Sequence, residues 1–339
     1  MKLDTTLLAP DLAAMATYTA AAEAIGFDGL WASETKHDPF LPLVLAAEHS
    51  RRLTLGTGIA VAFPRSPTTL AHLAWDLARY SQGRFILGLG PQVWAHNERR
   101  FGVKWEKPIR KMRETIEAMH AIWDAWQNDR PLRYRGEFFK LTLMTPFFSG
   151  GPLDYPPPPI YLAAVNKQML TLAGNLGDGV FIHALHSVDY LRQLARPAIA
   201  QGAAQANRTP EAVTVSAALF VVPTDDPKPA GHYEAYVRQQ LAFYMSTPAY
   251  RTVLALHGWE ETGYQLSKLA QRGRWADMPA LISDAMLDTF ALSGPWGGLP
   301  GQIKTRYGDM LDRVTYYLPF EPGPSEAGWR ATIAGFRSL

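Results

Sequence analysis

Eight short apolar segments follow one another along the chain, and a helical pattern separates every consecutive pair of them. Such regular alternation favours parallel strands joined by helices, and the first turn carries no glycine fingerprint of an open doubly wound sheet. We therefore predict a closed (β/α)8 TIM barrel with insertions, formed by residues 1–339 as a single domain. The predicted strands cover residues 3–8, 28–32, 53–61, 85–90, 160–164, 179–183, 213–222 and 314–318.

Charge and composition limit the classes of protein to which the chain can belong. Lys and Arg number 33 against 31 Asp and Glu, and this net charge of +2 favours neither nucleic acid nor an acidic membrane surface as a partner. The chain has no cysteine, which excludes disulfides and a thiol nucleophile and fits a cytoplasmic location. We see neither a signal-peptide pattern nor an apolar run long enough to span a bilayer.

Two segments interrupt the alternation. Residues 133–143 have the pattern of a small accessory hairpin or extended excursion. The stretch that follows, 146–159, is rich in Gly and Pro, so we expect it to be irregular and to carry the chain over the barrel rim. Residues 223–312 form a helix-rich excursion between the seventh and eighth strands. Since the segments after the strands build the active-site face of such a barrel, part of this excursion should belong to that face.

Residues 160–183 have the pattern of a strand, a tight turn, a helix and a second strand. Ala163 and Ala164 are small enough to let a ligand approach the backbone, and Asn166 is a good N-cap. The amides of residues 165–167 are the unpaired donors of a helix start, which suits a phosphate. The alternative is a βαβ packing unit without a ligand.

Polar and glycine-rich segments after the other strands complete the candidate face. Gly56 and Gly58 lie inside a predicted strand, where glycine indicates a bulge or the close approach of a ligand. The sequence has no His-Glu-x-x-His spacing and no Gly-x-Ser-x-Gly elbow, so we predict neither a metal site nor a hydrolase. The segments that should meet at this face are 34–38, 58–65, 90–100, 163–167 and 183–187.

A set of motifs extends from one end of the chain to the other, in a specific order and spacing. The motifs are Gly26–Trp31 with Ser33-Glu34, Leu55–Ile59, Gly88–Gly90, Tyr161–Val165, Leu172–Gly174 and Gly177–Gly179. In these motifs the chain resembles the bacterial-luciferase-like flavin and deazaflavin oxidoreductases, and among them the branch that uses coenzyme F420. The fold of that family is a (β/α)8 barrel with insertions, and its members pair through their early helices, which implies a homodimer.

The resemblance also implies a cofactor site. Gly58-Ile59 occupies the position of a non-prolyl cis peptide in a bulge that supports the deazaflavin ring, where the alternative is an ordinary glycine bulge. Ala163, Ala164, Val165 and Asn166 match the cofactor's phosphate site, and His183 matches a small polar residue beside it. We also assign Gly90 and Pro91, where the fourth strand ends, to the cofactor site. Arg65, Arg99, Arg100 and Lys104 form a basic rim that would suit the polyglutamate tail of F420, or a solvated charged surface.

The catalytic positions depart from the family pattern. Relatives that oxidise sugar phosphates and alcohols carry an acid followed directly by histidine, whereas this chain has Glu34-Thr35 and places the histidine at position 37. We take His37 and His96 as candidate proton partners, because a histidine titrates near neutral pH, and Glu34 as a group that orients one of them or binds the ring. The alternatives are an N-cap role for residues 37–39 and a surface pair between His96 and Glu98. Trp94 and His186 are the candidate substrate contacts.

Three functions remain open. The first is F420-dependent hydride transfer between the deazaflavin and a small, moderately apolar substrate. The second is an FMN-dependent monooxygenase, which would need a separate flavin reductase as partner. The third is a flavin or deazaflavin binder without catalytic activity.

Overall fold

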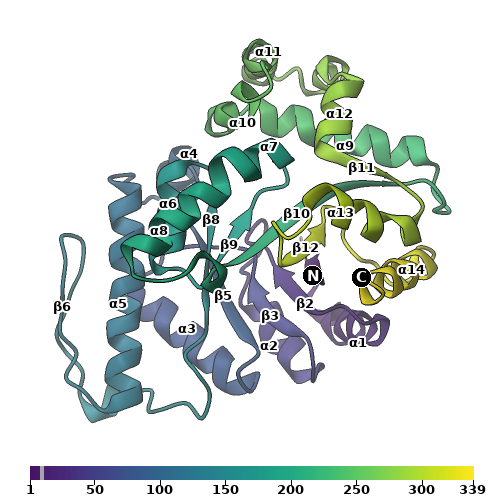
Figure 1. The fold of residues 1–339 in the computed structure, drawn as a ribbon. Coiled ribbons are helices and arrows are strands. Elements are labelled where there is room, and N and C mark those ends of the chain that lie inside the picture. Colours follow the sequence, from purple (N-terminus) through teal and green to yellow (C-terminus); the bar gives the residue numbers. More distant parts are fainter. Residues whose placement is uncertain (8–10) are drawn as a thin grey trace.

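Eight parallel strands close into a barrel in the computed structural model, which describes residues 1–7 and 11–339 (Figure 1). Around the barrel the strands follow the order β1–β2–β3–β5–β8–β9–β10–β12, and β12 pairs with β1 to complete the ring. The predicted fold class is thereby confirmed. Leu8, the last residue of the first predicted strand, lies outside the described residues. The strand bounds are β1 Lys2–Leu7, β2 Gly29–Ala32, β3 Thr54–Thr57, β5 Phe85–Gly90, β8 Ile160–Ala164, β9 Gly179–Ile182, β10 Thr214–Pro223 and β12 Arg313–Tyr316.

The third strand differs from its prediction as one continuous segment over 53–61. It ends at Thr57, and a separate two-residue strand, β4 (Ala60–Val61), continues the pairing with β5. The Gly58-Ile59 peptide bond between them is cis, as the resemblance implied. The chain therefore forms a bulge at the carboxyl end of β3.

Bulky side chains fill the interior of the barrel. Trp31, Ile86 and Tyr161 form a buried cluster, and the half-buried Phe181 packs against it. Beside this cluster Arg313 of β12 donates to both carboxylate oxygens of Asp4 on β1, at 2.8 and 2.6 Å, and both side chains are almost completely buried. The ion pair thus joins the first and last strands of the barrel.

Helices cover the outside of the barrel. One of them, α14, was not predicted, although Trp329, Thr332 and Ile333 lie at helical spacing and are buried. Another, the short α4 (Trp94–Arg99), occupies a segment that we expected to be a loop. The main outer helices are α1 Met15–Ile25, α2 Leu41–Glu48, α3 Pro67–Tyr80, α5 Pro108–Asn128, α6 Lys167–Leu176, α8 Arg196–Gln205 and α14 Glu326–Arg337.

The helical segment that follows β9 is not continuous. It begins as α7 (Val188–Tyr190), widens into a π-helical segment over Leu191–Ala195, and continues as α8. Pro197 lies in the first turn of α8 and has no amide hydrogen to donate into the preceding turn. The local change in helix type follows from that missing donor.

The insertion at 133–159 starts as the expected hairpin, with β6 (Tyr134–Arg135) antiparallel to β7 (Lys140–Leu141) beside α5 (Figure 1). The Gly- and Pro-rich stretch contains one short 3-10 turn, Pro146–Phe148, which we had not expected. It then crosses the ends of α3 and α5, where the side chains of Trp75 and Gln127 donate hydrogen bonds to its backbone carbonyls. From there the stretch leads into β8. The chain therefore passes below the barrel, at the amino ends of the strands, and not over the rim that carries the site.

In the excursion between β10 and β12, the part from α9 to α12 stands at the top of Figure 1, beyond the ends of β8, β9 and β10, and α13 lies lower, beside α14. Among the described residues, no helix is both long and apolar enough to cross a membrane. The excursion consists of α9 Ala230–Met245, η5 Pro248–Tyr250, α10 Arg251–Ala255, α11 Glu260–Gln271, η6 Trp275–Leu281, α12 Asp284–Phe290, the short strand β11 Ala291–Gly294 and α13 Leu299–Tyr307.

Candidate active site

Three of the predicted cofactor residues meet at the carboxyl ends of neighbouring strands. A Cβ atom added at Gly90, the last residue of β5, would lie 2.8 Å from Cδ1 of Ile59 and 3.3 Å from Cβ of Ala163. Only glycine leaves the backbone open at this point. Ile59 and Ala163 are half-buried, so these residues form a small apolar surface at the mouth of the barrel.

Hydrogen bonds hold the bulge that carries Ile59. The hydroxyl of Ser33 donates to the carbonyl of Gly58 at 2.8 Å, and the amide of Glu34 donates to the carbonyl of Ile59 at 3.3 Å. The amide of Gly58 donates in turn to the carbonyl of Ala32 at 2.8 Å. Residues that directly follow β2 therefore donate hydrogen bonds to both carbonyls of the cis dipeptide.

Glu34 is fully engaged by protein groups. Its carboxylate accepts from the Val61 amide at 2.7 Å and from both terminal nitrogens of Arg65, at 2.7 and 3.1 Å. Arg65 also pairs with Asp38 at 3.0 Å and donates to the Val61 carbonyl. Only 6% of the Glu34 side chain is exposed. The structure thus places this residue under the bulge and does not bring it to either histidine that we had expected it to orient.

The start of α6 has the predicted form. The side chain of Asn166 accepts from the Met169 amide at 3.0 Å, which confirms the N-cap. The carbonyl of Val165 accepts from the hydroxyl of Tyr190 at 2.6 Å, so the turn is also held from outside. Helix starts of this kind present free amides and the positive end of the helix dipole to an anion.

His183 follows β9 and lies beside this turn, because Ala164 pairs with Ile182 in the parallel register. Its Nδ1 accepts from the Leu185 amide at 3.1 Å, so the ring proton of the neutral form resides on Nε2. Burial, together with the neighbouring His186, lowers the pKa of His183 to about 3. His183 is therefore a neutral hydrogen-bond donor at physiological pH.

His186 lies below the mouth. Its side chain is buried, its Nδ1 donates to the carbonyl of His183 at 2.7 Å, and its Nε2 has no partner among the described residues. Burial lowers the pKa of His186 to about 4. With 1% of the residue exposed, this conformation offers no surface to the substrate contact that we had predicted.

The candidate proton partners, His37 and His96, are both exposed. Asp38 accepts from the amides of Phe40 and Leu41 in the turn before α2, whose N-cap is Phe40 and has no side-chain cap hydrogen bond. The loops of the two histidines meet, since Arg100 donates to the carbonyl of Thr35.

Trp94 is 45% exposed and lies under the guanidinium of Arg99, with the charge 4.7 Å from the ring centroid. The other three members of the basic rim also have protein partners. Arg65 binds Glu34 and Asp38, Arg100 binds a carbonyl, and Lys104 pairs with Glu106 at 2.7 Å. Each of the four basic side chains of the rim thus has a protein partner.

An aromatic wall on the other side of the mouth was not predicted. The rings of Tyr244 on α9 and Tyr250 on η5 lie 4.2 and 4.7 Å from the ring of His183. Tyr317, which directly follows β12, forms a hydroxyl–hydroxyl hydrogen bond with Tyr244. Tyr317 could have been predicted as a site residue, because it lies at the end of a predicted strand. The contacts of Tyr244 could not have been predicted, because they depend on how the excursion folds back onto the barrel.

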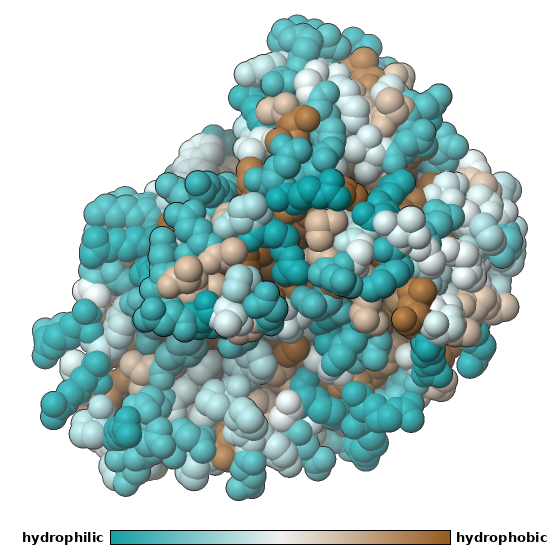
Figure 2. Space-filling model, viewed as in Figure 1, coloured by the Kyte–Doolittle hydropathy of each residue, from teal (hydrophilic) through white to brown (hydrophobic). Residues whose placement is uncertain are grey.

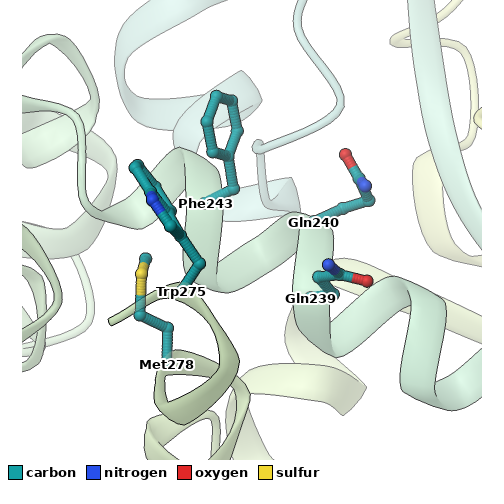
Figure 3. Close-up of a pocket in the computed structure, with 5 residues that line it drawn as sticks. All are labelled: Gln239, Gln240, Phe243, Trp275 and Met278. Carbon is teal, nitrogen blue, oxygen red and sulfur yellow. The ribbon is translucent and has the colours of Figure 1, made fainter. Parts of the chain in front are cut away.

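Figure 2 shows apolar surface between the excursion and the barrel, surrounded by hydrophilic residues. A cavity of about 110 Å³ lies within the excursion, between α9 and η6, and a more open hollow of about 510 Å³ shares Gln239 and Trp275 with it. Neither includes a residue predicted for the cofactor. The residues that line the smaller cavity are Gln239, Gln240, Phe243, Trp275 and Met278 (Figure 3).

The described part of the chain contains no group of three or more His, Cys, Asp or Glu side chains that could hold a metal ion.

Residues 2–313 match the family profile of the luciferase-like monooxygenases. The chain belongs to the luciferase-like monooxygenase family. This confirms the resemblance read from the motifs, and it assigns the protein to a class of oxidoreductases and monooxygenases.

Individual members of the luciferase-like family show how far the similarity extends. An uncharacterized protein of Mycobacterium tuberculosis is 44% identical over 327 residues, which cover 96% of this chain and 95% of the relative. The 5,10-methylenetetrahydromethanopterin reductase of Archaeoglobus fulgidus is 31% identical, with 82% and 81% covered. The structure of the coenzyme F420 dependent tetrahydromethanopterin reductase of Methanopyrus kandleri superposes with a TM-score of 0.78 at 22% identity, covering 97% and 96% of the two chains.

Proposed function

We propose that this luciferase-like protein is an F420-dependent oxidoreductase that transfers a hydride between the deazaflavin and a small, moderately apolar substrate. The observation that carries the proposal is the surface of Ile59, Gly90 and Ala163, which adjoins the start of α6 because Ala163 lies on β8, the strand that leads into that helix. A cofactor with a flat ring and a phosphate would use both features.

The residues present fit the cofactor. Ile59, raised on its bulge, would support one face of the ring, and the absence of a side chain at Gly90 would let the ring approach the backbone. The amides of residues 165–167 would hold the phosphate, and His183 would add a neutral donor from Nε2. When bound, the deazaflavin would supply carbon 5 as the hydride donor or acceptor, and the protein would supply orientation, a proton and shelter from water.

The family itself supports the second candidate, an FMN-dependent monooxygenase with a separate reductase. Equilibrium titration of the purified protein with F420 and with FMN, followed by fluorescence, separates the two functions. Our proposal predicts micromolar or tighter binding of F420 and much weaker binding of FMN. The reverse order would establish the monooxygenase, and binding of F420 without turnover of any substrate would leave a non-catalytic deazaflavin binder.

A further inference from the structure

The reaction proposed above needs a proton as well as a hydride. When a hydride reaches the carbon of a polarised double bond, the bonding electrons move to the second atom, which must then be protonated. A protein donor sheltered from water performs this step best. The question is which side chain at the mouth holds a proton that it can release.

Most ionisable groups at the mouth are poor donors. The Glu34 carboxylate accepts three hydrogen bonds from Arg65 and Val61, so both of its oxygens are already engaged by protein groups. His183 is neutral, with its Nδ1 occupied by the Leu185 amide, and a neutral imidazole releases its remaining proton less readily than a phenol. His37, on the segment after β2, and His96, on α4, are both exposed to water.

Among the phenols of the aromatic wall, Tyr244 and Tyr317 are joined by a hydrogen bond, and we take this pair as the candidate donor. Tyr317 is tied to the carboxyl end of the barrel, since it directly follows β12 and its amide donates to the Leu219 carbonyl at 2.7 Å. Tyr244 reaches the same place from α9, with its ring against His183. Both residues are half-buried, so the pair is sheltered while it keeps some access to the mouth.

We propose that Tyr244 is the proton donor of the reaction, that Tyr317 is a positioning residue that donates to the Tyr244 oxygen, and that the substrate is reduced at a polarised double bond. The inference rests on the proposed function. In the reaction the substrate carbon gains a hydride from the reduced deazaflavin. The second atom of the double bond takes the proton of the Tyr244 hydroxyl as it receives the displaced electron pair. The phenolate of Tyr244 then recovers a proton from water, and the oxidised deazaflavin is the other product.

Either hydroxyl can donate in this bond, and we assign the donor role to Tyr317. Burial raises the pKa of Tyr244 to about 12, and the bond from Tyr317 acts in the opposite direction. Burial raises the pKa of Tyr317 well above its usual range, and the charge and the hydrogen bond of Tyr244 add to that rise. With Tyr317 as the donor of the bond, the proton of Tyr244 is left free for the substrate.

The first test compares Tyr244→Phe, Tyr317→Phe and wild type as holoproteins loaded with reduced F420. Stopped-flow absorbance would follow a single turnover with cyclohexanone, cyclohex-2-enone or 2-methyl-1-pyrroline as the acceptor. We expect Tyr244→Phe to slow hydride transfer by about 100-fold or more and to abolish the solvent deuterium isotope effect. Tyr317→Phe should cost about tenfold, the effect of one lost hydrogen bond. Tyr264→Phe, on α11 in the same excursion, is the control and should change the rate less than about twofold.

The second test needs no cofactor. With 3-fluorotyrosine at position 244 of the apoprotein, fluorine NMR would report the ionisation of this phenol alone. We expect Tyr317→Phe to raise its pKa by about one unit, because the donor that stabilises the phenolate is lost. A pKa that does not rise would overturn the positioning role of Tyr317.

The remaining outcomes distinguish this inference from the proposed function. Unchanged single-turnover rates in Tyr244→Phe, with F420 bound normally, would overturn the donor alone. Reduction of none of the three acceptors by wild type would overturn the substrate class. Failure of wild type to bind F420 would overturn the proposed function, and the donor assignment with it.

Discussion

Arg65 donates to both carboxylate oxygens of Glu34, at 2.7 and 3.1 Å, directly below the bulge that carries Ile59. The same carboxylate accepts from the Val61 amide at the far end of that bulge. An acid that the sequence places among the catalytic candidates therefore fixes the backbone on which the cofactor ring is expected to rest. Its contribution to the reaction would come through the position of Ile59.

Arg65→Met should destabilise the protein and weaken cofactor binding together. The variant leaves the Glu34 carboxylate largely buried and without its cation, which we expect to lower the free energy of unfolding by about 3 kcal/mol. Urea denaturation measures this loss. Arg274→Met is the matched control, because its exposed pair with Asp277 should contribute less than about 1 kcal/mol. Equal effects of the two substitutions would contradict the structural role of Arg65.

A methyl group at position 90 should disturb the ring site and little else. In Gly90→Ala the new Cβ meets the end of the Ile59 side chain, which must turn toward the space meant for the ring. We expect affinity for F420 to fall about tenfold, or roughly 1.4 kcal/mol, in a fluorescence titration. Gly301→Ala, at a position with open space around it, should bind as wild type does. Full affinity in Gly90→Ala would place the ring elsewhere.

The buried histidines should make the fold sensitive to acid. The folded-state pKa of His186 is about 4, against 6.5 for an unperturbed histidine, so both states are neutral above pH 6.5. Between pH 6.5 and about 4 the unfolded chain takes up a proton that the folded chain refuses, and stability falls as the pH falls. The loss should approach about 3 kcal/mol.

Urea denaturation across this pH range tests the effect. His186→Gln should lower the slope of unfolding free energy against pH by about 1.4 kcal/mol per pH unit. His232→Gln replaces an exposed histidine and should leave the slope unchanged. Identical slopes in all three proteins would show that His186 is not held neutral.

The two exposed histidines should be less important than the sequence indicates. His37→Ala and His96→Ala remove side chains that lie in water, so we expect each to slow single-turnover hydride transfer by less than about tenfold. Their effect should remain small when the two substitutions are combined. A loss of about 100-fold in either single variant would move the proton donor from Tyr244 to that histidine.

The barrel was predictable because its signals are local. Each strand is a short apolar run, and Asn166 marks the start of α6 within its own turn. Gly58, Gly90 and Ala163 were also recognisable, since small residues at strand ends have a steric meaning that does not depend on distant contacts.

The environment of the site was not predictable in the same way. Whether Glu34 faces a ligand or Arg65 depends on contacts between segments 31 residues apart. The separation along the sequence is greater for Tyr244 and Tyr317, which are hydrogen-bonded although 73 residues apart in the chain. His186 illustrates the same limit. Its side chain packs against Tyr307 of the excursion, and the residues next to His186 in the sequence do not indicate that contact.

The central claim is that the mouth of this barrel binds a deazaflavin. The most direct measurement is a titration of the purified wild-type protein with F420 and with FMN under identical conditions. We predict a dissociation constant in the micromolar range or below for F420 and one at least about 100-fold higher for FMN, a difference of roughly 2.7 kcal/mol. Absence of F420 binding, or tighter binding of FMN, would contradict the account.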